Sequence, residues 1–205
     1  HGKELEQVIV EGPRGLKILP GASGVEAMSR LTDERVKAFL EEIERYCSAM
    51  DYVVVDTAPG ISSTVINCLL AADDIVLVTN TEPTALTDAY ALLKGLNARC
   101  PDGHKGVLVV MNQTSSKEEA LGGFDRLRRT AKRFLGWDLE YLGSVCWDET
   151  VSLATKRQVD FLTHYASAPC SRDIRKLAAR LVSGSQSGQQ DLGRFFRKMM
   201  EPADE

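Results

Sequence analysis

Short apolar segments alternate with segments of helical periodicity along most of this chain of 205 residues. Five segments rich in Val, Ile and Leu have the length of β-strands: Leu16–Leu19, Tyr52–Val55, Ile75–Val78, Val107–Met111 and Tyr141–Val145. Four of the five are hydrophobic nearly throughout, as is typical of strands buried on both faces. Such strands in alternation with helices predict an α/β fold, in which a mostly parallel β-sheet is covered by helices on both faces.

The spacing of apolar residues predicts four helices. The first follows a candidate N-cap residue, Thr32, the second begins near Pro83, the third spans about Lys117 to Leu135, and the fourth follows Pro169. The side chains expected to face the core are, helix by helix, Val36, Phe39, Leu40, Ile43 and Cys47; Leu86, Ala89, Leu93 and Leu96; Leu121, Phe124, Leu127, Ala131 and Phe134; and Ile174, Leu177 and Leu181. We expect these elements to form one domain over residues 1–182.

Charge and cysteine content argue against several classes of protein. The chain has 25 Lys and Arg against 29 Asp and Glu, a net charge of −4, which gives no general indication of nucleic-acid binding. Its five cysteines are scattered without a C-x-x-C pair, as expected of reduced cytosolic thiols rather than a disulfide framework, a zinc site or an iron–sulfur cluster. No apolar run approaches the roughly 20 residues needed to cross a bilayer. We therefore expect a cytoplasmic protein.

Residues 51–60, DYVVVDTAPG, place Asp56 at the end of an apolar strand and follow it with a Pro-Gly turn. Ligands bind at the carboxyl ends of the strands of a parallel sheet. An aspartate there can hold Mg²⁺ through a water molecule, and a glycine after it lets a backbone N–H approach a terminal phosphate. The pattern alone is equally compatible with an ordinary strand that ends in a polar turn.

Longer stretches of the chain resemble the MinD/ParA class of P-loop ATPases, and most closely its FlhG-type members, which regulate flagellar number. Residues 51–96 are similar to the Walker B and switch II region of that family, and TEPTALTDAYALLK within them is especially FlhG-like. Val8–Gly24 resembles the strand and loop that precede the first helix. VVMNQ at Val109–Gln113 resembles the strand that recognises the base, and Tyr141–Gln158 resembles the last strand and the loop that closes over it.

The resemblance runs from about Gln7 to Leu181 and implies a site for Mg-ATP. It assigns Asp56 to a water-mediated contact with Mg²⁺, and places Thr57 beside it in the nucleotide site. It assigns Gly60 to the switch that senses the γ-phosphate. These residues would act in ATP hydrolysis in a family member that has the whole site.

The resemblance also assigns residues to the adenine base. It makes Asn112 the residue that recognises the adenine edge, a role that suits the adjacent donor and acceptor of an amide; a plain cap at the end of the strand is the alternative. Asp148 lies in the loop expected to close over the base. The family usually has an apolar residue and a proline before that acidic residue, whereas this chain has Cys146 and Trp147. Packing over the end of the sheet is the interpretation that we favour for Trp147, and stacking near the base is the alternative.

The phosphate-binding loop of the family, K-G-G-x-G-K-[ST], does not occur in the chain, and neither does the aspartate of the first switch. That loop cradles the phosphates and holds Mg²⁺. We therefore expect a fragment, rather than a degenerate family member, that binds no nucleotide firmly and does not hydrolyse ATP. In the family the strand before this loop lies mid-sheet, so Tyr52–Val55 and Ile75–Val78 would each have an unpaired edge. We expect these edges to pair with each other, with a second copy in a strand-swapped oligomer, or with another polypeptide.

The end of the chain is a separate predicted element. SGSQSGQQ at 183–190 has the composition of a flexible linker, and residues 191–205 begin with an amphipathic helix, DLGRFFRKMM. Its apolar side comprises Leu192, Phe195, Phe196, Met199 and Met200, and its opposite side is cationic. Such a helix suits reversible docking on an anionic membrane, in agreement with the C-terminal targeting helix of MinD-class proteins. Packing in a groove of its own domain or of a partner is the alternative.

Three hypotheses of function follow. The first is an ATP-switched, dimeric, membrane-associated regulator of flagellar number, flagellar placement or cell-pole organisation, with a flagellar-assembly protein as partner. The second is an interaction module without catalysis. The third is a DNA-partitioning ATPase. The net charge disfavours this hypothesis, and a charged helix face is usually only solvated. The basic cluster that suggests DNA comprises Arg126, Arg128, Arg129, Lys132 and Arg133.

Overall fold

The computed structural model describes residues 8–20, 33–100 and 106–184. The chain divides into two units, of which the first includes the described residues up to Asp56 and the second those from Thr57 onward. The described elements of the first unit are strand β1 (Val10–Glu11), the 3-10 turn η2 (Pro13–Gly15), strand β2 (Lys17–Ile18) and helix α2 (Asp33–Cys47). β1 and β2 pair antiparallel, and α2 occupies the predicted first helix.

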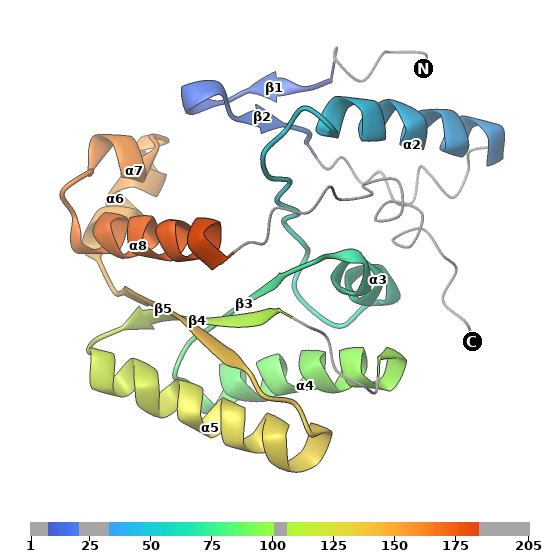
Figure 1. Ribbon diagram of the computed structural model, residues 1–205. Helices are drawn as coiled ribbons and strands as arrows, with labels where there is room; N and C mark the ends of the chain where they lie inside the picture. The colour runs from blue at the N-terminus through green and yellow to red at the C-terminus, as the bar shows by residue number, and fades with distance from the viewer. Residues whose placement is uncertain (1–7, 21–32, 101–105, 185–205) are drawn as a thin grey trace. The chain divides into compact units, whose positions relative to one another are not determined.

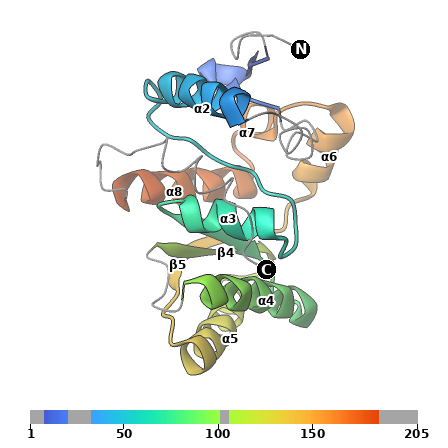
Figure 2. The ribbon, with the colours of Figure 1, turned by 90° about the vertical axis from the view of Figure 1, so that its right-hand side faces the viewer.

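The second unit contains the sheet. Its elements are α3 (Ser63–Ala71), β3 (Ile75–Thr79), α4 (Pro83–Arg99), β4 (Val107–Thr114), α5 (Lys117–Leu135), β5 (Glu140–Cys146), α6 (Glu149–Arg157), α7 (Phe161–His164) and α8 (Pro169–Gly184). The three strands are parallel and lie in the order β3-β4-β5. Helices α4 and α5 cover one face of the sheet and α8 covers the other (Figures 1 and 2). The predicted α/β fold is thus confirmed.

Each face of the sheet has its own core. On the face of α4 and α5, Val109 and Met111 of β4 are fully buried and pack with Leu93 and Leu96 of α4. On the face of α8, Val110 of β4 joins a second cluster with residues of β5 and α8. Burying an aliphatic side chain of this size contributes about 1.5–3 kcal/mol, so a strand buried on both faces is strongly held.

α8 lies close to β5 because of Gly143. This glycine has a φ of 154°, and a Cβ at its position would lie 2.6 Å from Leu177 Cδ2 and 3.1 Å from Arg180 Nη1, both on α8. The register between β4 and β5 slips beside it, where Leu142 is an extra residue in β5. The Arg180 guanidinium donates to the Leu142 carbonyl at 2.5 Å and satisfies a backbone group that the bulge leaves outside the ladder. The bulge thereby fastens α8 to its strand.

Two side chains of α5 do not face the core as predicted. Leu121 is 49% exposed and Phe134 is 63% exposed. The buried stripe of α5 includes Gly123, where a Cβ would lie 2.7 Å from Met111 Cε and 2.9 Å from Thr81 Cγ2. The helix therefore turns a small residue toward the sheet to approach it closely, and this rotation moves the two large side chains outward.

The predicted strand Tyr52–Val55 is wrong for this structure. The segment has no regular secondary structure, and its side chains are exposed, to 90% at Val54. A strand requires a ladder of backbone hydrogen bonds, and none of the described residues pairs with this segment. Among the described residues, β3 pairs with β4 alone.

β3 is half covered, contrary to the prediction of strands buried on both faces. Ile75 and Leu77 are buried under α4, whereas Val76 and Val78 on the opposite face are 43% and 57% exposed. α8 contacts β5 most closely, and its apolar cluster extends to β4 but does not include β3.

Candidate functional site

The three strands of the sheet end along one edge because they are parallel. We call it the carboxyl edge. Residues 80–82 follow β3, residues 115–116 follow β4, and residues 147–148 follow β5. The Trp147 N–H donates to the Thr114 carbonyl at 3.0 Å, which fastens the segment after β5 to the end of β4. The edge thus gathers amide, hydroxyl and carboxylate groups where α/β proteins bind ligands.

Asn112 lies in a bulge at the end of β4. The register with β5 slips between Met111 and Thr114, where β4 carries an extra residue. Gln113, inside the bulge, has a φ of 55°, in the left-handed region that few residues other than glycine adopt. Asn112 is half-buried and Gln113 is exposed. The bulge therefore places two amides in succession at the carboxyl edge, and an amide has the donor and acceptor that match the edge of an adenine base.

Asp148 caps α6 and holds the start of α8. Its Oδ1 accepts hydrogen bonds from the Thr150 N–H at 2.9 Å and from Thr150 Oγ1 at 2.7 Å. Its Oδ2 accepts from the Cys170 N–H at 3.3 Å. These hydrogen bonds, with that of the Thr150 hydroxyl foremost, lower the pKa of Asp148 to about 2. Asp148 thus stabilises the starts of α6 and α8 at the carboxyl edge. Its contact with a nucleotide stays a prediction.

Glu119, which was not predicted, joins the ends of β3 and β4. One of its carboxylate oxygens accepts from Thr81 Oγ1 at 2.5 Å, and the other accepts from the Ser115 N–H at 2.8 Å and from the Ser115 hydroxyl. These hydrogen bonds lower the pKa of Glu119 to about 2, and the one from the Ser115 hydroxyl has the largest effect. Ser116 caps α5 by accepting from the Glu119 N–H. The S-x-x-E pattern of a capping box is the sequence signal that indicates this clamp.

Asp56, Thr57 and Gly60 lie before α3. Asp56 is exposed and ends the first unit, whereas Thr57, in the second unit, is half-buried. Gly60 has a φ of 111°, a conformation that strains any side chain, although no described atom would crowd a Cβ there. Ser62 then caps α3 by accepting from the Val65 N–H at 3.3 Å. The backbone accounts for a glycine at position 60, and its phosphate-sensing role stays a prediction.

The basic cluster on α5 is partly neutralised by neighbouring acids. Asp125 lies 3.9 Å from Arg128 and 3.7 Å from Arg129. Asp138 lies 3.7 Å from Arg128 and 3.8 Å from Lys132. Exposed ion pairs of this kind contribute little to stability, but they reduce the positive charge that the helix presents to a phosphate backbone.

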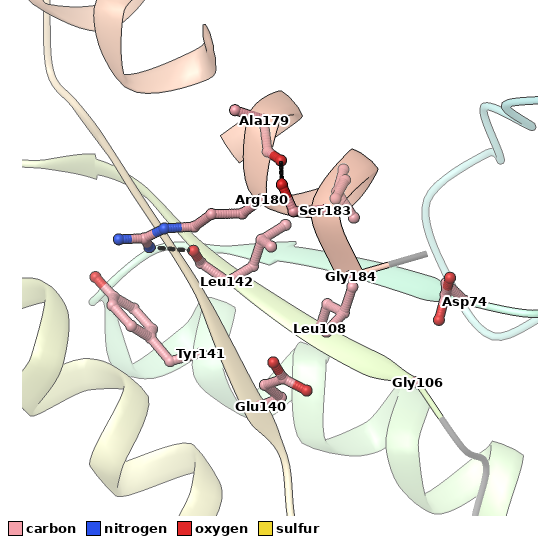
Figure 3. Close-up of a pocket in the computed structure, with 11 residues that line it drawn as sticks. Asp74, Gly106, Leu108, Glu140, Tyr141, Leu142, Ala179, Arg180, Ser183 and Gly184 are labelled. Atoms are coloured by element: carbon pink, nitrogen blue, oxygen red, sulfur yellow. Dashed lines mark hydrogen bonds between the residues drawn. The ribbon is translucent and has the colours of Figure 1, made fainter. Parts of the chain in front are cut away.

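A cavity of about 580 Å³ lies at the opposite edge of the sheet, at the amino ends of the strands (Figure 3). Asp74 and Gly106 line it just before β3 and β4, Glu140 lines it at the start of β5, and α8 contributes Arg180 and its last turn. The Arg180 guanidinium is engaged with the Leu142 carbonyl in the cavity wall. This cavity is separate from the carboxyl edge, to which we assign the candidate site because parallel sheets bind ligands there.

The thiols near the carboxyl edge are poor nucleophiles. Burial, reinforced by Asp173, raises the pKa of Cys146 to about 11, and burial also raises the pKa of Cys170. All five cysteines are free. Within residues 8–20, 33–100 and 106–184, no group of three or more His, Cys, Asp or Glu side chains is arranged to hold a metal ion. Within the same residues, no helix has the length and apolar character to span a bilayer.

The predicted membrane-binding side chains lie outside the described residues. They are Leu192, Phe195, Phe196, Met199 and Met200. Of the predicted linker, Ser183 and Gly184 form the last turn of α8, and the rest lies outside the described residues as well.

The sequence is similar to those of several known proteins, although no protein-family model matches the chain. It is 36% identical over 180 residues to the antiactivator FleN of Pseudomonas aeruginosa, which covers 88% of this chain and 64% of FleN. It is 32% identical over 208 residues to the flagellum site-determining protein YlxH of Helicobacter pylori, which covers 97% of this chain and 68% of YlxH.

A more distant relative is an uncharacterized ATP-binding protein of Methanocaldococcus jannaschii. It is 22% identical over 186 residues, which covers 91% of this chain and 66% of that protein. The chain therefore spans about two thirds of the length of each of these relatives. The extent and identity of the matches to FleN and YlxH show that this chain belongs to the FlhG-type branch of the MinD/ParA family of ATPases.

Proposed function

We propose that this protein is an ATP-switched regulator of the number or placement of flagella. The observation that carries the proposal is the similarity, over 88% and 97% of this chain, to proteins named as an antiactivator and as a flagellum site-determining protein. The relative named as an ATP-binding protein supports a nucleotide as the switching ligand.

The nucleotide that we propose is ATP with Mg²⁺. The carboxyl edge suits its base, because the amides of Asn112 and Gln113 lie there in succession with the donor and acceptor pattern that adenine matches. Asp56 is of the type that orients water on Mg²⁺, and the φ of 111° at Gly60 keeps the chain free of a side chain where a phosphate would approach. In a family member that has the whole site, bound ATP would supply a γ-phosphoryl group whose loss distinguishes two states. The chain itself lacks the K-G-G-x-G-K-[ST] loop, so we propose that it holds ATP weakly and does not hydrolyse it.

The output that we propose is reversible membrane association of a homodimer. Leu192, Phe195 and Phe196 supply an apolar side to the tail, and its basic side chains suit anionic lipids. One short helix binds a membrane weakly, so a dimer that presents two would bind much more firmly. A flagellar-assembly protein would be the partner that responds to the switch.

A count of flagella tests the proposed function. Cells that lack the gene should have an altered number or placement of flagella in electron micrographs, and the unchanged gene should restore them. Asn112→Ala and Asp56→Ala should fail to restore them, whereas Val54→Ala, at a side chain that is 90% exposed, should succeed. Normal flagella in cells without the gene would exclude a regulatory role.

Co-sedimentation with anionic liposomes tests the tail. Phe195→Glu combined with Phe196→Glu should abolish binding, because each Phe contributes roughly 1.5–3 kcal/mol when buried and a carboxylate reverses that gain. Phe134→Glu is the matched control, since Phe134 is an aromatic side chain of α5 that is already 63% exposed. Equal sedimentation of the double variant and the parent would show that the tail is not the anchor.

DNA partitioning is the less favoured function. Asp125 and Asp138 pair with three of the five basic side chains of α5, namely Arg128, Arg129 and Lys132. Salt-sensitive binding of duplex DNA that is lost on Arg129→Ala would reverse this preference.

A further inference from the structure

We propose that Cys146 and Cys170 form a redox-active thiol pair, which small-molecule disulfides convert to a disulfide bond between β5 and α8. Cys146 is the last residue of β5, and Cys170 is the second residue of α8. Neither the pair nor its chemistry depends on bound ATP, so this reaction lies beyond the proposed regulatory function.

Two crossed hydrogen bonds hold together the segments that carry the pair. The Cys146 N–H donates to Asp173 Oδ2 at 3.3 Å, and Asp173 lies three residues after Cys170. The Cys170 N–H donates to Asp148 Oδ2 at 3.3 Å, and Asp148 lies two residues after Cys146. Each cysteine is therefore bound, through its backbone, to a residue that closely follows the other. The end of β5 thus contacts the first turns of α8 where the two thiols lie.

The side chains of the pair also belong to the same apolar region. Cys170 is part of the cluster between the sheet and α8, and Cys146 packs against that cluster. The charge of the Cys170 thiolate is among the effects that raise the pKa of Cys146, and such an effect falls off with distance. A disulfide forms without movement of the backbone only where two sulfur atoms are already close. The backbone and side-chain contacts both bring these two close.

The two thiols differ in their access to solvent. Cys170 is fully buried, whereas Cys146 is half-buried. Trp147, directly after Cys146, is 66% exposed, contrary to the packing over the end of the sheet that the sequence favoured. Solvent therefore reaches the segment that carries Cys146. A reagent in solution would meet Cys146 first, and Cys170 would react with a sulfur already bonded to Cys146.

The reaction consists of two thiol–disulfide exchanges. The Cys146 thiolate attacks one sulfur of glutathione disulfide, forms a mixed disulfide and releases one glutathione thiolate. The Cys170 thiolate then attacks the sulfur of Cys146, forms the bond between the two cysteines and releases the second glutathione. The two cysteine thiols are oxidised, and their two electrons and two protons leave in the two glutathione thiols.

The raised pKa values of the pair make it slow to oxidise and make its disulfide hard to reduce. Burial, reinforced by neighbouring charges, raises the pKa of Cys146 to about 11, so little thiolate is present near neutral pH to attack a disulfide. Burial raises the pKa of Cys170 as well. A disulfide is strongly oxidising when its reduced thiolates are stabilised, and this pair has the opposite property. The pair would therefore respond to sustained oxidation rather than to a brief exposure.

The bond would change how α8 is attached to the sheet. It would close residues 147–169, which contain α6 and α7, into a covalent loop. The two crossed hydrogen bonds can open one at a time, whereas a covalent bond holds until it is reduced. Oxidation would thus prevent the start of α8 from separating from the carboxyl edge.

Peptide mapping of the whole chain by mass spectrometry identifies the bond directly. The protein is brought to equilibrium in reduced and in oxidised glutathione buffers at about pH 8, where more thiolate is present, and free thiols are then blocked with N-ethylmaleimide. Trypsin cleaves after Lys156 and Arg157, so Cys146 and Cys170 lie in separate peptides that a disulfide would join. The joined peptides should be the main disulfide product in the oxidised buffer and should be absent from the reduced buffer.

Thermal unfolding shows whether the bond forms in the folded protein. Oxidation should raise the Tm of the parent by about 5–10 °C, because the bond constrains the unfolded chain. Cys146→Ser should show no such shift. Cys100→Ser, at another half-buried thiol that lies at the end of α4, should shift as the parent does. A Tm that falls when the parent is oxidised would overturn the proposal.

Three results of the mapping would also overturn it. Cys146 that carries glutathione without a bond to Cys170 would show that the two sulfur atoms are too far apart. Cys146 that stays unmodified in the oxidised buffer would show that reagents do not reach it. A bond from Cys146 to Cys47, Cys68 or Cys100 would assign it a different partner. None of these results would bear on ATP binding or on flagellar number.

Discussion

Two apolar segments of similar composition differ sharply in burial in this molecule. Val109 and Met111 in β4 are fully buried, because β4 lies between two other strands and under helices on both faces. Tyr52–Val55 is also rich in valine, but it forms no ladder with the described residues, and Val54 is 90% exposed. The difference shows that apolar composition provides the free energy for a buried strand only when neighbouring strands satisfy its backbone groups.

The largest expected effect comes from placing a carboxylate in each of the two segments. Val109→Asp should prevent the second unit from folding stably, with a loss above about 4 kcal/mol, because an unpaired charge would be buried in the core. Val54→Asp should change the free energy of unfolding by no more than about 0.5 kcal/mol. Denaturant unfolding followed by Trp137 emission measures both. A comparable loss in Val54→Asp would mean that Tyr52–Val55 is buried in solution.

Two adjacent glycines of α5 test how closely β4 is packed. Gly123→Ala should cost about 1–3 kcal/mol, because its Cβ would overlap Met111 of β4 and Thr81. Gly122→Ala, with no described atom near its Cβ, should stabilise the helix by about 0.4–1 kcal/mol. Thermal unfolding should therefore show a loss of stability for Gly123→Ala and a gain of stability for Gly122→Ala. A stabilising Gly123→Ala would mean that the helix can move away from β4 at little cost.

Two aspartates give the smallest expected effect. Asp148→Ala should cost about 1 kcal/mol near pH 7, as loss of a helix N-cap usually does, and Asp56→Ala should cost almost nothing. The pKa of Asp148 lies at about 2, below its ordinary value of 3.8. Its stabilisation is therefore complete above about pH 4–5 and is lost as the pH falls toward 2.

Urea unfolding of the parent and of Asp148→Ala between pH 7 and pH 2 measures that loss. The difference between the two proteins should stay constant down to about pH 5 and then shrink. A difference that persists unchanged at pH 2 would show that the carboxylate charge is not what stabilises the start of α6.

The elements that are predictable from sequence are those whose partners lie nearby in the chain. The bounds of α5, Lys117–Leu135, match the prediction because a serine N-cap and a glycine in the left-handed conformation at position 136 set its ends locally. The starts of β3 and β4 are predicted to the residue, and the other ends of β3, β4 and β5 are predicted to within three residues. Tyr52–Val55 is not, because its pairing depends on residues remote from it.

The candidate site is only partly predictable from the sequence, because some of its features depend on residues that are remote in the chain. The sequence places Asn112 and Asp148 at strand ends, and the structure brings both to the carboxyl edge. It does not indicate the left-handed Gln113, because bulges depend on the register between two strands. It also does not indicate that Trp147 is left exposed, since exposure depends on what packs over the end of β5.

α8 has a mechanical consequence for the second unit. Its first turns are tied to the end of β5 by Asp148 and Asp173, and its last turns are tied to the bulge of β5 by Arg180. A helix of sixteen residues spans about 24 Å, so these attachments connect the carboxyl edge and the opposite edge of the sheet through one rigid helix. Because α8 is attached near both of its ends, neither end can move independently of the other. A displacement at the carboxyl edge would reach the last turn of α8 as a movement of the entire helix.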